Sequence, residues 1–376
     1  MDKLKTDTLS PRCRSLVREL TDRQAFETFL TLPEYNGDVS RVLTCSLTPL
    51  VNSVTVADDG VTLEGSCQIR VLYLGQDGGL YAPEANEPFS FRLASSDCAG
   101  CRAVDFVWAE DCTARAVSPR KLEVHAALHM VVKCYRGEEL HLLSNAQGAG
   151  IQLKSETTPL LLTDDRISKK LTLTETLTLP AECADARRIL SSRAQAMLSD
   201  TKTAGSKMLL SGEATLTLLY LPEGNDLPQT AHMKLSFHET VDLEDLPEDG
   251  EKSARLRVEG VSVSLSGSGG RSVNCAIRLR ADITCGKTEP VRLVVDAFST
   301  RYEPEAAYVS LLSPKRERQI AETIPVVGEW ALSELSVEGV VDHCCRTEGV
   351  KIGSADGKLT VSGRVVFDAL LRAQDG

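Results

Sequence analysis

The stretch LEGSCQIRVLYL, residues 63–74, alternates apolar and polar side chains along its whole length. Side chains of a β-strand point alternately to its two faces, so a period of two predicts a half-buried strand. One face of the stretch carries Leu63, Gly65, Cys67, Ile69, Val71 and Tyr73, and the other carries Glu64, Ser66, Gln68 and Arg70.

The same pattern returns twice, as LSGEATLTLLYL at residues 210–221 and as VSGRVVFDALL at residues 361–371. A glycine occupies the third position of every copy, at Gly65, Gly212 and Gly363. The first two glycines lie 147 residues apart and the last two lie 151 residues apart. This period is too long for a solenoid unit and is typical of a whole domain, so the sequence predicts repeated domains.

Composition and charge are those of an ordinary globular protein. The 376 residues predict two or three domains, with 42% hydrophobic and 25% charged residues. A net charge of −11 repels a phosphate backbone, so we expect no nucleic-acid partner. The N-terminus lacks a secretory h-region and no apolar run approaches 18 residues, so we expect no membrane insertion. We expect the twelve cysteines to be free thiols in a reducing cytoplasm.

Further segments recur at nearly the same offset. Residues 26–43 match residues 173–190, and each segment predicts a strand that ends at Leu-Pro. Asp38 and Asp185 follow at matching positions, each as the expected N-cap of a short helical turn. The later matches are residues 88–91 with 234–237 and 120–134 with 271–285, and the variable segments between them are residues 92–119 and 238–270.

These strands predict a mainly β fold of tandem, β-sandwich-like domains, each with one short helix or helical turn. We expect an N-terminal lead-in over residues 1–19, with a short helix at 15–20. A first repeat follows over 20–165, a second over 166–314 and an incomplete third over 315–376. The third copy stops soon after its own alternating strand. We therefore expect a truncated chain, or alternatively a partial third unit that packs on the second.

The segment CAGC, from Cys98 to Cys101, has the spacing of a zinc or redox motif, with Cys112 nearby. A structural zinc ion takes four ligands, and a thioredoxin-type site needs a βαβ context. The second repeat has no counterpart of this segment. A loop with incidental thiols is the favoured interpretation, and a zinc or thiol enzyme that uses Cys98 and Cys101 is the alternative.

Other ligand-type residues are also scattered. On a strand, His125 and His129 would lie about 13 Å apart, too far to share one metal ion. Residues 342–345 read DHCC, but adjacent cysteines on a strand point to opposite faces. The sequence therefore favours surface histidines and no shared site at residues 342–345.

Two loops resemble ligand sites only superficially. Residues 266–270 lack the Lys-Ser/Thr ending of a P-loop, so they predict a hairpin loop. The acidic residues 242–251 lack the spaced Asp/Asn-Gly pattern of a calcium loop, so they predict a solvated loop. No GxSxG, HExxH or Ser-His-Asp signature is present. We predict no catalytic, cofactor-binding or metal-binding residues and no enzyme.

The order of the repeated motifs resembles the SPOCS domain of clostridial spore-coat proteins. The shared features are a strand ending in Leu-Pro, a turn that begins at Asp, a glycine followed by LYL, a PFSF-like segment and a strand led by Arg. An apolar pair follows the turn, at Val42-Leu43 and at Ile189-Leu190. The resemblance covers two repeats over residues 20–314 and the start of a third after residue 316.

In the best-known member type, tandem SPOCS domains precede a LysM domain, and the protein binds the spore-coat ATPase at the forespore surface. The resemblance implies a structural and interaction protein of spore-coat assembly in the mother-cell cytoplasm, with this ATPase as a candidate partner. The LysM domain is implicated in ATPase binding, and no LysM-like segment is visible here, so no residue is assigned to that partner. A carbohydrate- or peptidoglycan-binding module is the alternative, although aromatic residues are only 5% of the chain, with Trp108 and Trp330 the two tryptophans.

Overall fold

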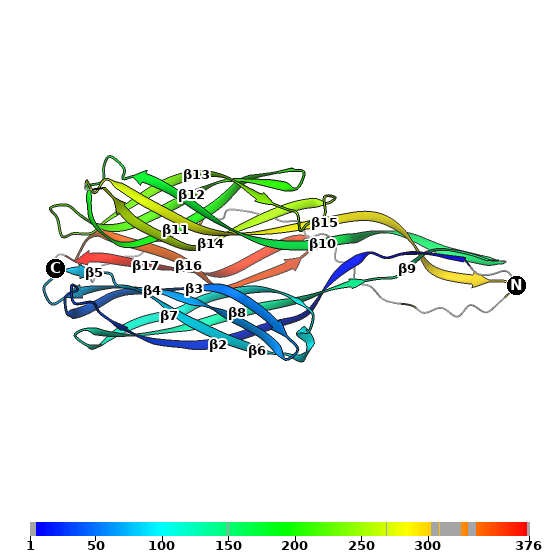
Figure 1. Cartoon of the computed structure of the whole chain (residues 1–376), viewed down its shortest axis with the longest axis horizontal. Helices are drawn as coiled ribbons and strands as arrows, with labels where there is room; N and C mark the ends of the chain where they lie inside the picture. The colour runs from blue at the N-terminus through cyan, green and yellow to red at the C-terminus, as the bar shows by residue number, and fades with distance from the viewer. Residues whose placement is uncertain are drawn as a thin grey trace.

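The computed structural model describes residues 5–148, 150–267, 269–301, 308, 325–329 and 336–373. Within these residues the chain forms seventeen strands and a single 3₁₀ turn, η1, and Figure 1 shows the strands gathered into two long barrels with a hairpin beside them. The predicted mainly β fold of tandem domains is confirmed. The helix expected at residues 15–20 is wrong, because these residues belong to β2.

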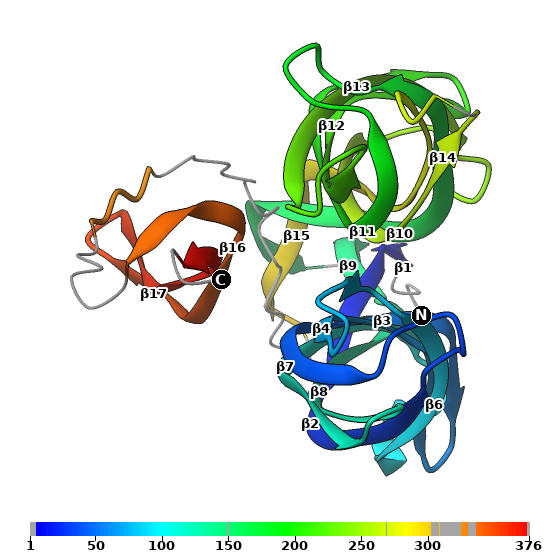
Figure 2. The same ribbon diagram turned by 90° about the vertical axis from the view of Figure 1, so that its left-hand side faces the viewer.

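The first barrel consists of two antiparallel sheets. One sheet has the order β2-β8-β7, and the other places β4 between β3 on one side and β5 and β6 on the other. The elements are β2 (Arg12–Thr31), β3 (Val39–Ala57), β4 (Gly60–Gly75), β5 (Leu80–Tyr81), β6 (Glu84–Ala94), η1 (Ser96–Cys98), β7 (Arg102–Ser118) and β8 (Lys121–Glu139). Strands β3 and β7 pack along each other where the two sheets meet, and the end-on view shows the sheets rolled into a barrel (Figure 2).

The second barrel repeats this order. Its sheets are β10-β15-β14 and β11-β12-β13. The strands are β10 (Ile151–Thr178), β11 (Ala186–Ala204), β12 (Lys207–Pro222), β13 (Gln229–Asp242), β14 (Glu251–Ser266) and β15 (Ser272–Ser299). Strand β10 runs through residues 165 and 166, where the sequence placed the boundary between the repeats.

A stalk extends from the barrels toward the N-terminus (Figure 1). Strand β1 (Lys5–Leu9) pairs with β9 (Leu142–Gln147), and the far ends of β10 and β15 pair beside them. The N-terminal segment therefore forms a paired strand of the stalk and then the start of β2. Strands β10 and β15 of the second barrel also reach into the stalk, and each is 28 residues long.

The alternating stretches form the central strand of one sheet in each barrel. Residues 63–74 lie in β4 and residues 210–221 lie in β12, each with a strand paired on both sides. On the inward face of β4, Leu63, Cys67, Ile69, Val71 and Tyr73 are fully buried. Because every second residue of these strands faces the core, burial accounts for the period of two.

The glycine in the third position has a steric reason. A Cβ on Gly65 would lie 2.7 Å from the Phe89 ring and would also overlap the backbone carbonyl of Leu50. A Cβ on Gly212 would lie 2.6 Å from the Phe237 ring and would overlap the carbonyl of Met197. Phe89 and Phe237 are therefore equivalent, at an offset of 148 residues, so the match of residues 88–91 with 234–237 is wrong by two residues. In each barrel the glycine and this phenylalanine form one contact.

One arginine per barrel holds the turn that follows Leu-Pro. Arg120, at the turn into β8, donates to the carbonyls of Leu32, Pro33 and Asn36 and to Asp38 Oδ1 at 3.1 Å. Arg271 makes the equivalent bonds in the second barrel, to Pro180, Cys183 and Asp185.

The two aspartates do not cap a helical turn as predicted. Residues 33–38 form a turn without a helix, and Asp38 and Asp185 each form an ion pair with the arginine of their own barrel.

The tyrosine of the LYL motif holds the same turn from inside. Tyr73 donates its hydroxyl proton to the Gly37 carbonyl at 2.9 Å, and Tyr220 donates to the Ala184 carbonyl at 2.9 Å. Burial raises the pKa of Tyr73 and of Tyr220 to about 12. The Leu-Pro turn, the aspartate, the tyrosine and the leading arginine therefore build one hydrogen-bonded network at an end of each barrel.

These tyrosines predict alkaline instability. A pKa raised from 10.0 to about 12 means that the folded protein keeps a proton that the unfolded chain releases. The tyrosines' contribution to stability is therefore complete below pH 10 and is lost as the pH rises toward 12. Urea unfolding curves should show this loss, and the double variant Tyr73→Phe/Tyr220→Phe should lose less stability over the same range. If the stability of the wild type fell no more steeply with pH than that of the variant, this assignment would be contradicted.

Candidate functional site

The CAGC segment is a buried corner of the first barrel. Cys98 ends η1, Cys101 follows it, and the Cys134 side chain of β8 lies beside them, all three buried. Burial and a hydrogen bond with the Cys98 thiol raise the pKa of Cys134 to about 12. Such a thiol stays protonated at neutral pH, which makes it a poor nucleophile and a poor metal ligand. Across the described ranges, no three His, Cys, Asp or Glu side chains are arranged to hold a metal ion.

The two histidines of β8 lie on its outer side, in separate contacts. His125 lies 3.4 Å from both Glu27 and Glu123. His129 lies 2.9 Å from Glu110 and stacks on Trp108 at a centroid distance of 5.2 Å. A sugar-binding site would need a free face of Trp108 to stack on the sugar ring. The His129 ring already occupies one of its two faces. Trp330 lies outside the described residues.

Both predicted loops connect strands. Residues 267 and 269–271 join β14 to β15, and Ser268 lies outside the described residues. The acidic segment joins β13 to β14, with Asp245 near Lys169 at 3.2 Å and Asp249 near Lys287 at 3.3 Å. Exposed carboxylates paired with lysines fit the predicted solvated loop. Among the described residues, no helix is long and apolar enough to cross a membrane.

The residues that do come together over long sequence distances lie between the barrels. Arg70 of β4 reaches across to the second barrel, where it donates to the carbonyl of Ser192 at 2.6 Å and to that of Val261 at 3.0 Å. Its Nε lies 2.7 Å from Glu84 of its own barrel. The Arg70 side chain is only 15% exposed, so this arginine is a buried link between β4 and the seam of β11 and β14.

A second arginine links the barrels in the opposite direction. Arg280 of β15 lies 3.2 Å from Asp105 of β7, whose side chain is only 2% exposed. Glu259 at 3.8 Å and Asp282 at 3.5 Å surround the same guanidinium within the second barrel. Since a buried carboxylate is costly without a partner, Arg280 fixes the first barrel against the second.

Outward-facing leucines of the two barrels form a shared apolar cluster with the C-terminal hairpin. The hairpin consists of β16 (Val337–Ala355) and β17 (Lys358–Ala373), which pair with each other. The cluster contains leucines at equivalent positions of the two barrels and the hairpin, namely Leu72, Leu219 and Leu370. Their partners on the neighbouring strands, Thr44, Ser191 and Asp342 respectively, also match. Figure 2 shows these three units around a common centre.

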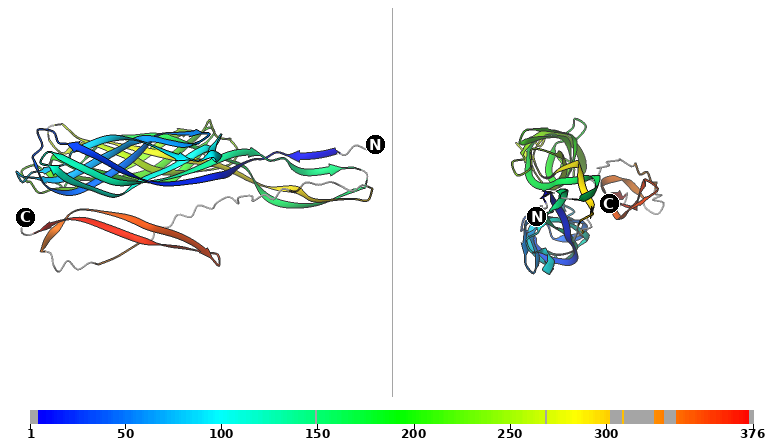
Figure 3. Two further views of the ribbon diagram at one scale, coloured as in Figure 1. Left: turned by 90° about the horizontal axis from the view of Figure 1, so that it is seen from below. Right: turned by 90° about the vertical axis from the view of Figure 1, so that its right-hand side faces the viewer.

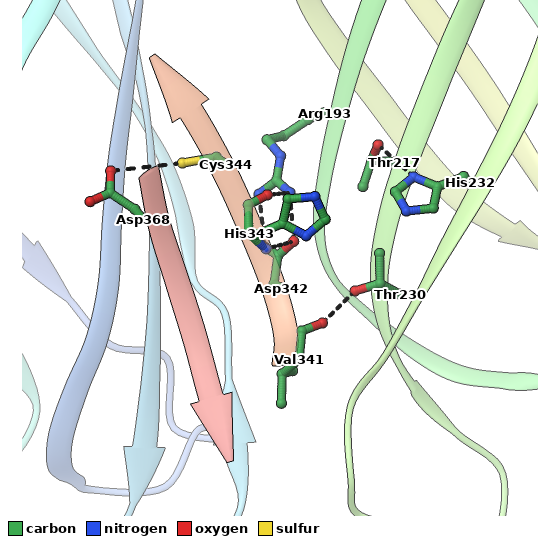
Figure 4. Close-up of polar contacts among 9 residues, drawn as sticks. All are labelled: Arg193, Thr217, Thr230, His232, Val341, Asp342, His343, Cys344 and Asp368. Carbon is green, nitrogen blue, oxygen red and sulfur yellow. Dashed lines mark hydrogen bonds and ion pairs between the residues drawn. The ribbon is translucent and has the colours of Figure 1, made fainter. Parts of the chain in front are cut away.

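The hairpin is anchored to the second barrel by an ion pair. Arg193 of β11 donates to both carboxylate oxygens of Asp342, at 2.8 and 2.6 Å, and to the carbonyl of His343 at 2.9 Å. Thr230 of β13 donates to the Val341 carbonyl at 2.6 Å (Figure 4). These contacts hold the hairpin against the second barrel.

The contact between the two barrels and the contact between the second barrel and the hairpin use the same hydrogen-bond acceptor position. Ser192 and His343 occupy equivalent places in β11 and β16, 151 residues apart. In each junction an arginine of the preceding unit donates to this carbonyl, Arg70 in the first junction and Arg193 in the second. The units are thus joined in succession by similar contacts made from different strands.

The face of the hairpin that corresponds to the barrel core is exposed. Val361 is 54% and Phe367 is 42% exposed, whereas Leu63, Leu210 and Ile69 at core positions of the complete barrels are fully buried. The hairpin lies along the barrels (Figure 3). Its residues in the shared cluster are Val341 and Leu370, and Val361 and Phe367 are not among them. It supplies the equivalents of β3 and β4 alone among the described residues.

The segment at residues 342–345 has a role that its ligand-type composition did not reveal. Asp342 binds Arg193, His343 stacks on Phe367 at 5.6 Å, and Cys344 lies 3.9 Å from Asp368. The segment therefore attaches the hairpin rather than gathering ligands. Differences between the repeats could have indicated which residues join the units. Arg70, for example, contacts the second barrel and has Thr217 at the matching position of the second repeat.

Replacing Arg193 with alanine should release the hairpin. The bidentate ion pair to Asp342, whose side chain is 14% exposed, should contribute about 1.5 kcal/mol, so amide exchange in β16 should rise about tenfold. Hydrogen-exchange mass spectrometry measures this, with β4 and β12 expected to stay unchanged. Arg187→Ala on the same strand removes an exposed pair with Asp226 and serves as the control. Equal exchange in both variants would contradict the anchor.

Two segments of the chain match a family model. The model described as SipL, SPOCS domain, matches residues 38–114 and residues 185–266. The matches run from β3 into β7 and from just before β11 through β14, so they cover equivalent parts of the two barrels. The resemblance to SPOCS-domain proteins is thereby confirmed. No curated protein and no solved structure matches the chain.

Proposed function

We propose that this chain, two segments of which match the SPOCS domain model, is a non-enzymatic structural and interaction protein of spore-coat assembly. The observation that carries the proposal is the pair of family matches at equivalent strands of two barrels. SPOCS domains point to sporulation, and tandem copies favour a scaffold because linked modules raise the effective concentration at a second binding site.

The internal chemistry supports an architectural role. The residues that define the repeated motif are used to build the barrels, namely Gly65 against Phe89 and Arg120 with Asp38. Their counterparts in the second barrel do the same. The surfaces that differ between the copies are the loops, above all residues 243–250, whose four acidic side chains are exposed while Leu243 and Leu246 are buried. Partner contacts would then lie on these variable loops.

The proposed setting is the mother-cell cytoplasm at the forespore surface. Among the side chains that the structure describes, eleven cysteines are free thiols, which fits a reducing compartment. The spore-coat ATPase is the candidate partner, by analogy with the best-known member type. We also propose that residues 315–376 belong to a third unit, since β16 and β17 occupy the place of β3 and β4 around the shared cluster.

A capture experiment from sporulating cells tests this function. The immobilised chain is expected to enrich coat proteins, the ATPase among them, over a lysate of vegetative cells, with the amounts measured by mass spectrometry. A variant with Glu244, Asp245, Glu248 and Asp249 changed to serine should fold normally, because all four side chains lie in an exposed loop. Loss of capture in this variant would place the surface there, and absence of coat proteins from the wild-type sample would contradict the function.

A further inference from the structure

Two cysteines of the first barrel face each other across the seam between its sheets. Cys45 lies on β3 and Cys112 lies on β7, and their Sγ atoms are 3.2 Å apart. Strands β3 and β7 belong to different sheets and meet through side-chain packing. A covalent bond here would therefore join the two sheets at the line where they meet.

We propose that Cys45 and Cys112 form a reversible disulfide that closes the first barrel along this seam. A disulfide has an S–S length of about 2.05 Å, so the sulfur atoms need to approach by about 1.2 Å. Small side-chain rotations supply such a shift. Both side chains are partly exposed, so a small oxidant can reach them.

The neighbouring thiols are less suited to this bond. Cys67 lies near Cys112, but it is fully buried, and burial raises its pKa to about 12. By contrast, a hydrogen bond from the Cys45 thiol lowers the pKa of Cys112. Since the thiolate is the attacking species, Cys112 is the expected nucleophile and Cys45 the resolving thiol.

The oxidant class is a small-molecule disulfide, and the exchange balances in two steps. First, the Cys112 thiolate attacks one sulfur of the small disulfide, which forms a mixed disulfide and expels one small thiolate. Next, Cys45 loses its proton to solvent, attacks the Cys112 sulfur and expels the second thiolate. The protein gives up two electrons and two protons, and the small disulfide becomes two thiols. Excess small thiol reverses both steps.

The second barrel provides an internal control for this proposal. Ser192 occupies the position that matches Cys45, 147 residues further along the chain, and its side chain is only 5% exposed. A serine therefore fits this place in the fold, so the variant Cys45→Ser should fold. Because the second barrel has a serine at this position, the proposed disulfide can form in the first barrel only.

Oxidation of the purified 376-residue chain with oxidised glutathione tests the proposal. After alkylation of remaining thiols and proteolysis, mass spectrometry is expected to find one peptide that links Cys45 to Cys112. The intact mass should fall by two hydrogen atoms, and the melting temperature of the first barrel should rise by about 5–15 °C. Dithiothreitol should reverse all three effects.

Variants separate this bond from other thiol chemistry. Cys45→Ser and Cys112→Ser should each abolish the linked peptide and the rise in melting temperature, whereas Cys275→Ser in the second barrel should retain both. The proposal is overturned if oxidation yields only glutathione adducts. A link between Cys67 and Cys112 in place of Cys45 would overturn it as well. Because the mass change is measured on the unmutated chain, the test does not depend on the variants being stable.

Discussion

Replacing Gly212 with alanine should destabilise the second barrel by about 3 kcal/mol. The added Cβ would lie 2.6 Å from the Phe237 ring and would overlap the Met197 carbonyl on the adjacent strand. Overpacking of a tight core costs about 1–3 kcal/mol, and a backbone carbonyl yields less than a side chain does. Chemical unfolding followed by circular dichroism measures the loss.

The matched control is Gly363→Ala in the hairpin. Its Cβ would lie 3.3 Å from the Glu348 carbonyl, in a hairpin whose corresponding face is exposed. This variant should change stability by less than about 0.5 kcal/mol. Equal effects at Gly212 and Gly363 would show that the repeated glycine serves something other than the contact with phenylalanine.

Replacing Arg280 with methionine should separate the barrels. The change leaves the Asp105 carboxylate, 2% exposed, without the guanidinium that lies 3.2 Å away. Removal of one partner of a buried pair costs about 3–5 kcal/mol. We expect earlier unfolding and faster amide exchange in β7 and β14, both measurable on the intact chain.

A double variant identifies the cause of that loss. Adding Asp105→Asn to Arg280→Met removes the unpaired charge, so part of the lost stability should return. Arg278 also lies on β15, but Asp105 pairs with Arg280 and not with Arg278. The variant Arg278→Met is therefore a control for the loss of an arginine side chain alone. No recovery in the double variant would mean that Arg280 acts through packing instead.

The strands and their repetition were predictable because they follow from local chemistry. Alternation at residues 63–74 marks a strand with one buried face, and the strand lies in the core as expected. The turn after Leu-Pro was also predicted, since proline ends a ladder. The role of Asp38 was not, because its partner Arg120 lies 82 residues away. Local patterns favour a helix cap for such an aspartate, and the distant arginine decides otherwise.

The junctions between units could not be predicted from the sequence for the same reason. Arg280 and Asp105 are 175 residues apart, and Arg193 and Asp342 are 149 apart. Arg280 and Arg193 stand on polar faces that alternation alone assigns to solvent, whereas Asp105 alternates with the core-packing Ala103 and Val107. Such a polar face is buried only by contact with another unit, and the strand pattern contains no information about that contact. The pairing of Cys45 with Cys112 depends on the meeting of two sheets in the same way.

The most direct test of the proposed role is the position of the protein in a sporulating cell. A fluorescent fusion of the full chain, produced in the mother cell during sporulation, is expected to gather in a layer at the forespore surface. Such a layer requires contacts with other coat proteins, which is what a coat scaffold makes. Even fluorescence throughout the mother cell, from a fusion shown to be intact, would contradict a role in spore-coat assembly.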